Sequence, residues 1–259
     1  MTRVSRFVWP LVMALLSVFL LGPLVLVAIF SFSSNELISF PMGAITLKWY
    51  REIAVNADFQ AALFNSLSIA LPVAVISTIT GTLAAYCFAE WRTRFGLPAL
   101  SVLGLPVLLP PLVIAISLVV LYVRWLGIPL GKPAVISGHV LVTQPLVAAV
   151  IAARMASFDF TVLDAARDLG ATRSQAFFKI TLPQIRAAII GAALIAFALS
   201  LDEFIIAVFT IGGGNTISTF VWGKIRTTLD PSINAIATLL LVMTIGLTLI
   251  AIRLTRYRG

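Results

Sequence analysis

Long apolar segments separated by short polar stretches make up most of the chain. An α-helix rises about 1.5 Å per residue, so roughly 20 apolar residues suffice to cross a ~30 Å hydrocarbon layer. The pattern therefore predicts six membrane-spanning helices, at about residues 7–32, 63–88, 97–122, 134–153, 187–210 and 234–252.

The first apolar segment follows two basic residues, Arg3 and Arg6, as the core of a signal peptide would. It is longer than the 7–15 residues of such a core, and no small-residue cleavage site precedes Ser33. We therefore expect a retained helix. No internal repeat or low-complexity linker divides the sequence, so residues 1–259 are predicted to form a single transmembrane domain.

Composition agrees with this pattern and excludes several function classes. Charged residues make up 11% of the chain, against about 25% in soluble domains, so the fold class is an all-α integral membrane protein. The net charge of +8 comes from basic residues scattered over loops and ends, without the aromatic and basic surface of a nucleic-acid binder. Cys87 and His139 are the only residues of their types, which leaves no disulfide framework, metal site or Ser/His/Asp set; His139 is expected at a helix end or interface.

Basic residues fall unequally on the two sides of the predicted spans. If the segment before the first span is cytoplasmic, that side carries twelve of the 18 basic residues. Because cytoplasmic loops hold the excess of Lys and Arg, both termini are predicted to be cytoplasmic. The twelve are Arg3, Arg6, Arg92, Arg94, Arg154, Arg167, Arg173, Lys179, Arg186, Arg253, Arg256 and Arg258.

Prolines interrupt three predicted spans. Each removes a backbone donor and kinks a membrane helix. Two interpretations stay open: kinks that only serve packing, and hinged helices around a path for a solute. The prolines are Pro72 in the second span, Pro106, Pro110 and Pro111 in the third, and Pro145 in the fourth.

One charged stretch, residues 163–183, lies between the fourth and fifth spans on the predicted cytoplasmic side. Thr161 and Asp164 have the spacing of a capping box, which predicts a helix start. Gly170 supplies the left-handed position that ends this helix, and a Thr-x-x-Gln box beginning at Thr172 predicts a second short helix. A third start is expected just before Pro183, at residue 181.

Two such short helices bury too little apolar surface to be stable alone, so we expect them to dock onto something. Packing against the chain's own helices is one alternative. The small side chains of Ala165 and Ala166 would also let another protein approach the backbone. Apolar side chains available for the contact are Leu169, Phe177, Phe178 and Ile180.

The spacing of this stretch resembles a known motif. Asp164-Ala165-Ala166, three residues, Gly170, nine residues, Ile180, one residue and Leu182-Pro183 is similar to the EAA loop of inner-membrane subunits of binding-protein-dependent ABC importers. Asp164 stands where that loop usually has Glu, which keeps the carboxylate and shortens its reach.

This resemblance implies a type I ABC importer permease fold in the bacterial inner membrane, with a cytoplasmic coupling loop at about residues 154–186. It implies a non-catalytic transport subunit without a cofactor of its own. The implied partners are a dimer of ATP-binding subunits that holds ATP and Mg, a second homologous permease, an external (periplasmic) solute-binding protein and membrane lipid. The residues assigned to coupling are Asp164, Ala165, Ala166, Leu169, Gly170 and Phe177.

Residues 200–204, the glycines at 212–214 and residues 230–235 resemble the spermidine/putrescine permease branch, in particular its second permease subunit. Branches for other small amines, opine-like compounds or iron share this framework and stay open. The sequence contains no Gly-x-x-x-x-Gly-Lys-Ser/Thr, so the energy would come from a partner, and the glycines at 212–214 are predicted as a turn.

Asp202 and Glu203 form an acidic pair well inside the fifth predicted span, where an unpaired charge costs at least ~2.5 kcal/mol. We favour one of them meeting a cationic solute, with Asp202 preferred, while the other braces a neighbouring helix. The alternative is an ion pair or a water-facing position near the outer rim.

Two other functions fit this acidic pair less well. An intramembrane enzyme is disfavoured because adjacent carboxylates on a helix point about 100° apart. A proton-coupled carrier would show an inverted repeat and leaves the charged loop unexplained.

Overall fold

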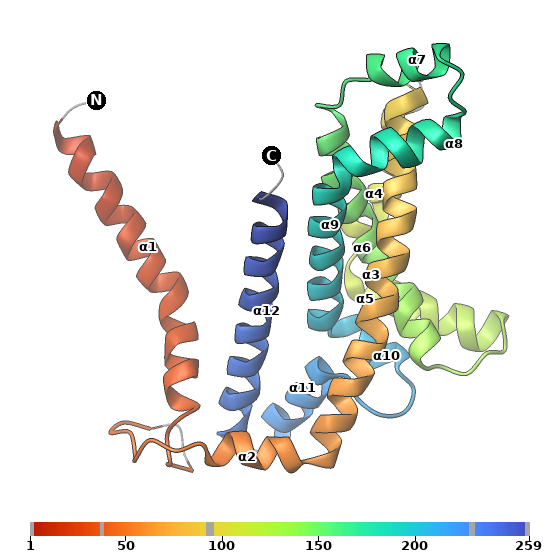
Figure 1. Ribbon diagram of the computed structural model, residues 1–259. Helices are drawn as coiled ribbons and strands as arrows, with labels where there is room; N and C mark the ends of the chain where they lie inside the picture. The colour runs from red at the N-terminus through yellow and green to blue at the C-terminus, as the bar shows by residue number, and fades with distance from the viewer. Residues whose placement is uncertain (1–2, 37–38, 92–95, 228–230, 257–259) are drawn as a thin grey trace. The chain divides into compact units, whose positions relative to one another are not determined.

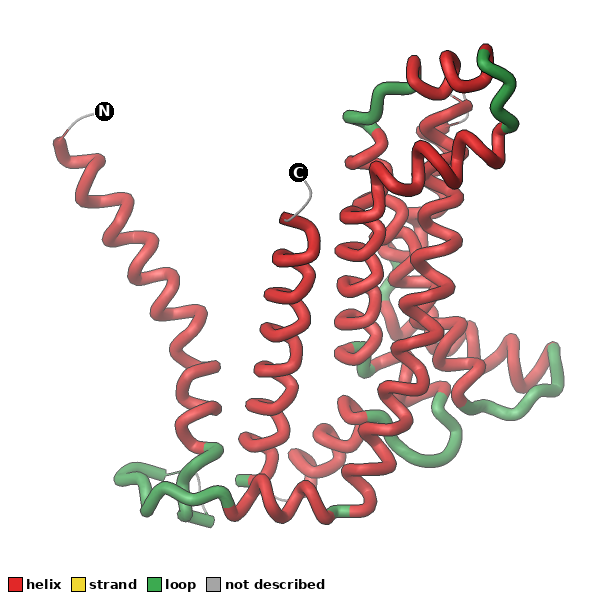
Figure 2. The backbone as a smooth tube through the Cα atoms, in the orientation of Figure 1, coloured by secondary structure: helices red, strands yellow, loops and turns green. Residues whose placement is uncertain are grey.

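The computed structural model describes residues 3–36, 39–91, 96–227 and 231–256, and within these residues it is built of helices and loops, without a named strand (Figure 2). Its backbone contacts divide it into two compact units, residues 1–60 with 220–244 and residues 61–219 with 245–259. The single domain of the sequence analysis remains a prediction.

Helices follow one another through the described residues (Figure 1). They are α1 (Arg3–Phe30), α2 (Lys48–Val55), α3 (Ala57–Trp91), α4 (Gly96–Leu108), α5 (Pro111–Val119), the π-helix η1 (Val120–Trp125), α6 (Lys132–Met155), α7 (Thr161–Asp168), α8 (Arg173–Ala176), the π-helix η2 (Phe177–Thr181), α9 (Leu182–Asp202), α10 (Ile205–Thr210), α11 (Ile217–Thr227) and α12 (Ser232–Arg256).

Five described helical stretches are long and apolar enough to cross a membrane, and a bent pair of helices makes a sixth candidate. The predicted segments of apolar residues are thus confirmed as mainly helical, with breaks in the third and the fifth. The orientation remains a prediction, and three residues that enter the charge count, Arg92, Arg94 and Arg258, lie outside the described residues, as does residue 230 of the polyamine-type pattern.

The third predicted span is not one straight helix. Residues 102–108 and 111–125 meet at an angle of 103°. The break falls at Pro110 and Pro111, where two successive residues lack a backbone N–H. Pro72 and Pro145, by contrast, lie inside the continuous helices α3 and α6.

The fifth predicted span differs at both ends. Helix α8, the π-helix η2 and α9 form one helical stretch of 30 residues, Arg173–Asp202, so the separate helix start expected at Thr181 is wrong. In the π-helical turn the N–H of Leu182 reaches the carbonyl of Phe177, and this wide turn lets the helix continue into Pro183. At the other end the helix stops at Asp202 rather than continuing to Thr210.

The core of the unit that contains residues 61–219 is centred on α6 and α9, which run side by side, with α7 beyond their ends (Figure 1). Small residues allow the close approach: Ala192 and Ala196 of α9 are fully buried. Helix α3 approaches α6 at Gly81, where an added Cβ would lie 2.8 Å from the Val147 side chain.

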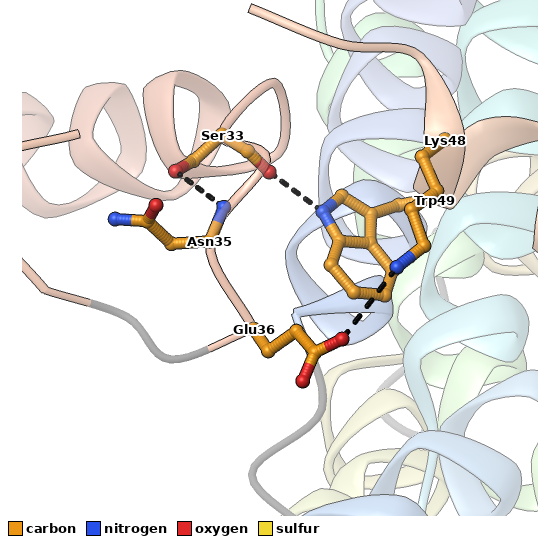
Figure 3. Close-up of polar contacts among 5 residues, drawn as sticks. All are labelled: Ser33, Asn35, Glu36, Lys48 and Trp49. Atoms are coloured by element: carbon orange, nitrogen blue, oxygen red, sulfur yellow. Dashed lines mark hydrogen bonds and ion pairs between the residues drawn. The ribbon is translucent and has the colours of Figure 1, made fainter. Parts of the chain in front are cut away.

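In the unit that contains residues 1–60, polar contacts order the segment between α1 and α2 (Figure 3). The indole N–H of Trp49 donates to the carbonyl of Ser33 at 2.7 Å, and the backbone N–H of Asn35 donates to the Ser33 hydroxyl at 3.3 Å. The Lys48 ammonium lies 3.9 Å from the Glu36 carboxylate. Helix α2, which the sequence analysis did not predict, buries Trp49 and Ile53 one turn apart.

Candidate functional site

The first candidate site is the loop that carries α7. Leu163, which is 1% exposed, anchors this helix in the core shared by α6 and α9. The predicted capping box is wrong: Phe160 holds the cap position, and the Thr161 N–H and hydroxyl both donate to the Asp159 carboxylate, at 3.0 and 2.7 Å. Asp159 thus accepts the Thr161 N–H, which is the bond that Asp164 was expected to make.

The hydrogen bond from the Thr161 hydroxyl, followed by that from its backbone N–H, lowers the pKa of Asp159. Asp164, expected to reach back to the helix start, instead lies 3.6 Å from the Arg167 guanidinium. The negative charges at 159 and 164 nevertheless both lie near the amino end of α7, where the helix dipole favours them.

Gly170 ends α7 as predicted. Its φ is +88°, in the left-handed region that side chains with a Cβ rarely adopt. The N–H of Gly170 donates to the carbonyl of Arg167 at 2.8 Å and the N–H of Ala171 to that of Ala166 at 3.0 Å, which is the bond pair of a Schellman motif.

The second predicted capping box is confirmed. The Gln175 N–H donates to the Thr172 hydroxyl at 3.2 Å, and the Thr172 N–H donates to the Gln175 side-chain oxygen at 2.9 Å. Reciprocal bonds of this kind satisfy two donors at the helix start. The start of the long helix that contains α9 is therefore fixed by residues that precede the predicted fifth span.

The outer face of this loop exposes apolar side chains. Leu169 is 90% exposed, and Ala165 beside it is exposed as well. A hollow of about 440 Å³ opens next to them; its lining is Ala166, Leu169, Gly170, Ala171, Gln175, Lys179 and Ile180. The small and apolar residues assigned to coupling thus lie together at one surface.

Phe177 is the exception among the residues assigned to coupling. It is half-buried, and its ring meets that of Tyr86 on α3 edge to face, with centroids 4.7 Å apart. Phe178, 63% exposed, presents the apolar surface instead. Spacing alone gave no sign of this exchange, because the partner of Phe177 is Tyr86, on a helix far away in the sequence.

The second candidate site is the acidic pair, which lies at a helix break. Asp202 is the last residue of α9, and Glu203 has an extended backbone, with ψ of 113°. The expectation that both residues share one helix is therefore wrong. Glu203 Oε1 accepts the N–H of Ile206 at 3.1 Å and so caps α10, and the Ser218 hydroxyl donates to the Glu203 carbonyl at 3.2 Å.

Asp202 differs from its neighbour. Its side chain is exposed, and no hydrogen bond or ion pair reaches its carboxylate from the residues that the structure describes. The chain thus holds one carboxylate of the pair in a structural contact and leaves the other free.

A buried polar contact that the sequence analysis missed lies one turn before the break. Nδ1 of His139 on α6 is 2.8 Å from the hydroxyl of Ser200 on α9, and both side chains are buried. His139 is therefore an interface residue, as expected. The only available signal was Ser200, a polar residue in a long apolar run. No group of three or more His, Cys, Asp or Glu side chains that could hold a metal ion occurs in the described part of the chain.

Comparison with known proteins finds a matching family model and similar permease proteins. A model of the family "Binding-protein-dependent transport system inner membrane component" matches residues 77–258. The putrescine transport system permease protein PotI of Escherichia coli (strain K12) is 36% identical over 247 residues, which cover 92% of this chain and 87% of that protein. The spermidine/putrescine transport system permease protein PotC of the same strain is 31% identical over 86% of this chain and 84% of its own.

Solved structures share the fold at lower identity. A chain in the crystal structure of a bacterial ABC transporter that imports the acidic polysaccharide alginate is similar with a TM-score of 0.75 and 17% identity, over 99% of this chain and 96% of that chain. A chain of the MetNI methionine ABC transporter, in an inward-facing conformation, gives a TM-score of 0.61 and 16% identity over 78% of this chain and 99% of its own.

Proposed function

Because the chain belongs to the family of binding-protein-dependent transport system inner membrane components, we propose that it forms half of an ATP-driven import path for a polyamine of the putrescine or spermidine class. The observation that carries this proposal is the 36% identity with a putrescine permease over 92% of the chain. The family and the apolar helices make it a multi-pass protein of the inner membrane.

The energy for import comes from a partner in this proposal. The sequence lacks a P-loop, so a separate subunit binds ATP and Mg and hydrolyses the ATP. The family is binding-protein-dependent, and in this proposal an external binding protein delivers the solute. One chain with one coupling loop engages one ATP-binding subunit, so a pair of such subunits requires a second, homologous permease.

The α7 loop is the proposed contact with the ATP-binding subunit. Its exposed Leu169 and the adjacent hollow offer apolar surface that the described part of the chain leaves uncovered. The Schellman turn at Gly170 fixes the angle between α7 and the long helix that begins at Arg173. Motion of α7 would therefore pass directly into α9.

Asp202 is the proposed contact with the solute. It ends α9, the same helix that the loop drives, and its carboxylate has no partner within the described residues. A polyamine carries ammonium groups that supply the missing countercharge in a medium of low dielectric constant. Glu203 is the brace, because its carboxylate already caps α10.

Uptake into vesicles that contain the purified complex tests the proposal. Labelled putrescine or spermidine should enter only when ATP can be hydrolysed. Replacement Asp202→Asn should lower uptake about tenfold or more, the worth of a hydrogen-bonded charge, while assembly and basal ATP hydrolysis stay near their original levels. Glu203→Gln is the matched control, because its amide oxygen can still cap α10.

Three outcomes would contradict parts of this proposal. Uptake without ATP hydrolysis would indicate a different class of transporter. Normal uptake by both variants would remove the acidic pair from the solute path. A stable, active complex with two copies of this chain and no other permease, detected by native mass spectrometry, would contradict the second subunit.

A further inference from the structure

Two adjacent residues of α6 contact the two helices on either side of the acidic break. His139 bonds to Ser200 in the last turn of α9, at 2.8 Å. Gly138 lies against α10: a Cβ added there would be 2.5 Å from Ile206 Cγ2 and 2.7 Å from Leu118 Cδ1 of α5. Helix α6 therefore holds the end of one helix by a hydrogen bond and the start of the next by close packing.

A separate buried polar contact joins α6 to α3. The hydroxyls of Ser77 on α3 and Thr143 on α6 are 2.7 Å apart, and the Thr143 hydroxyl donates to the carbonyl of His139 at 2.8 Å. All of these side chains are buried. Because hydrocarbon offers no water to replace a lost bond, each such contact fixes the rotation and height of the two helices that it joins.

From this geometry we infer that His139 is a positioning residue for Asp202. Ser200 lies in the last turn of α9, two residues before Asp202, so its bond to His139 fixes the direction in which the helix delivers that carboxylate. The inference rests on the proposed role of Asp202 as the solute contact. It assigns to the single histidine of the chain a role in positioning the solute contact rather than in proton transfer or metal binding.

The atom that makes the bond gives the inference a sharp test. An Asn side chain places its amide where Nδ1 of His lies, whereas a Gln side chain reaches the position of Nε2. No described residue bonds to His139 Nε2, so only the δ position should matter. His139→Asn should therefore keep the contact to Ser200, and His139→Gln and Ser200→Ala should lose it. Ser77→Ala is the matched control, since it removes a buried bond between α3 and α6 and leaves α9 untouched.

Two measurements on the assembled importer decide the matter. Hydrogen exchange at residues 199–206 should speed up about fivefold in His139→Gln and Ser200→Ala, the effect of one lost hydrogen bond, and stay unchanged in His139→Asn and Ser77→Ala. Polyamine uptake per ATP hydrolysed should fall by a similar factor in the same two variants. In an Asp202→Asn background, His139→Gln should cause no further loss, because both changes act on one contact.

The inference is overturned if His139→Asn is as damaging as His139→Gln, or if the losses of His139→Gln and Asp202→Asn multiply. Normal uptake by Asp202→Asn would instead reject the proposed solute contact. In that case the exchange data still decide whether His139 anchors the end of α9, so the two failures are distinguishable.

Discussion

The long helix that contains α9 is treated differently at its two ends. At the loop end, residues 172–183, the helix passes from η2 into Pro183 without a break and begins with a full capping box. At the acidic end, residues 200–204, it stops although no proline is near, and Glu203 turns to cap the next helix. Pro183 is tolerated inside this continuous helix because the π-helical turn before it widens the backbone where the proline ring would otherwise clash.

The loop end is therefore a continuous helix, whereas the acidic end is a break between two helices. The loop end is one continuous rod, suited to carry a displacement from α7 along α9. The acidic end is a joint held by three polar contacts, from His139, Ile206 and Ser218. A joint of this kind sets the direction of Asp202 without burying it.

The largest expected effect is a loss of uptake when the turn at the loop end is altered. Gly170→Val places a β-branched residue at a φ of +88°, which costs about 1–2 kcal/mol, although no neighbour lies within 4 Å of an added Cβ. We expect uptake to fall about tenfold, with weaker co-purification of the ATP-binding subunit and normal membrane insertion. Gly170→Asn, which tolerates the left-handed conformation, should keep most activity. Equal activity of the two variants would show that the turn does not couple the subunits.

The next effect tests the joint. Glu203→Ala removes the cap of α10 and should destabilise the protein by about 1 kcal/mol, a loss of roughly 2–4 °C in melting temperature. Asp202→Ala should leave the melting temperature nearly unchanged, because no described residue bonds to that carboxylate. Thermal unfolding of the complex, followed by tryptophan fluorescence, measures both. A larger loss for Asp202→Ala would reverse the roles of the pair.

A smaller effect separates the two threonines of the loop. Thr172→Ala removes half of a capping box and should cost roughly 0.5–1 kcal/mol, seen as faster hydrogen exchange over residues 173–177. Thr161→Ala leaves the backbone N–H bond to Asp159 in place and should change exchange within α7 less. If Thr161→Ala has the larger effect, the cap of α7 resides in the hydroxyl after all.

The smallest effect is on pH dependence at the loop end. Since hydrogen bonds from Thr161 lower the pKa of Asp159 in the folded protein, they stabilise the turn fully above the unfolded value of about 3.9 and are lost as pH falls through the folded value. Thr161→Val should raise the pKa of Asp159 toward its usual value. The carboxyl carbon shift of labelled aspartate, followed by NMR as the pH is lowered, measures this change.

Apolar length and glycine chemistry could be predicted from the sequence because each acts locally. Length alone gave the helices α1, α3, α6 and α12, and Gly170 gave the end of α7. The first capping box failed because Asp159, two residues outside the motif, competes for the same N–H.

Features that depend on neighbours could not be predicted in this way. The Ser218 hydroxyl holds the carbonyl of Glu203, fifteen residues earlier, just after the stop at Asp202, and the bond between His139 and Ser200 joins residues 61 apart. The inward position of Phe177 depends on its ring contact with Tyr86, on another helix. Long-range partners of this kind are visible only once the helices have packed.

The 103° bend between α4 and α5 bears on the number of times the chain crosses the membrane before α7. Each complete crossing reverses the side of the membrane on which the following segment lies, so a segment that enters and leaves by the same face would reverse every later assignment. With a cytoplasmic start, α7 can meet an ATP-binding subunit only after an even number of crossings, which the helices α1, α3 and α6 reach when the bent pair counts as one. With the cytoplasmic start that the sequence predicts, we therefore expect the bent segment to traverse the bilayer, and a reporter enzyme fused within residues 125–131 should be active on the external face.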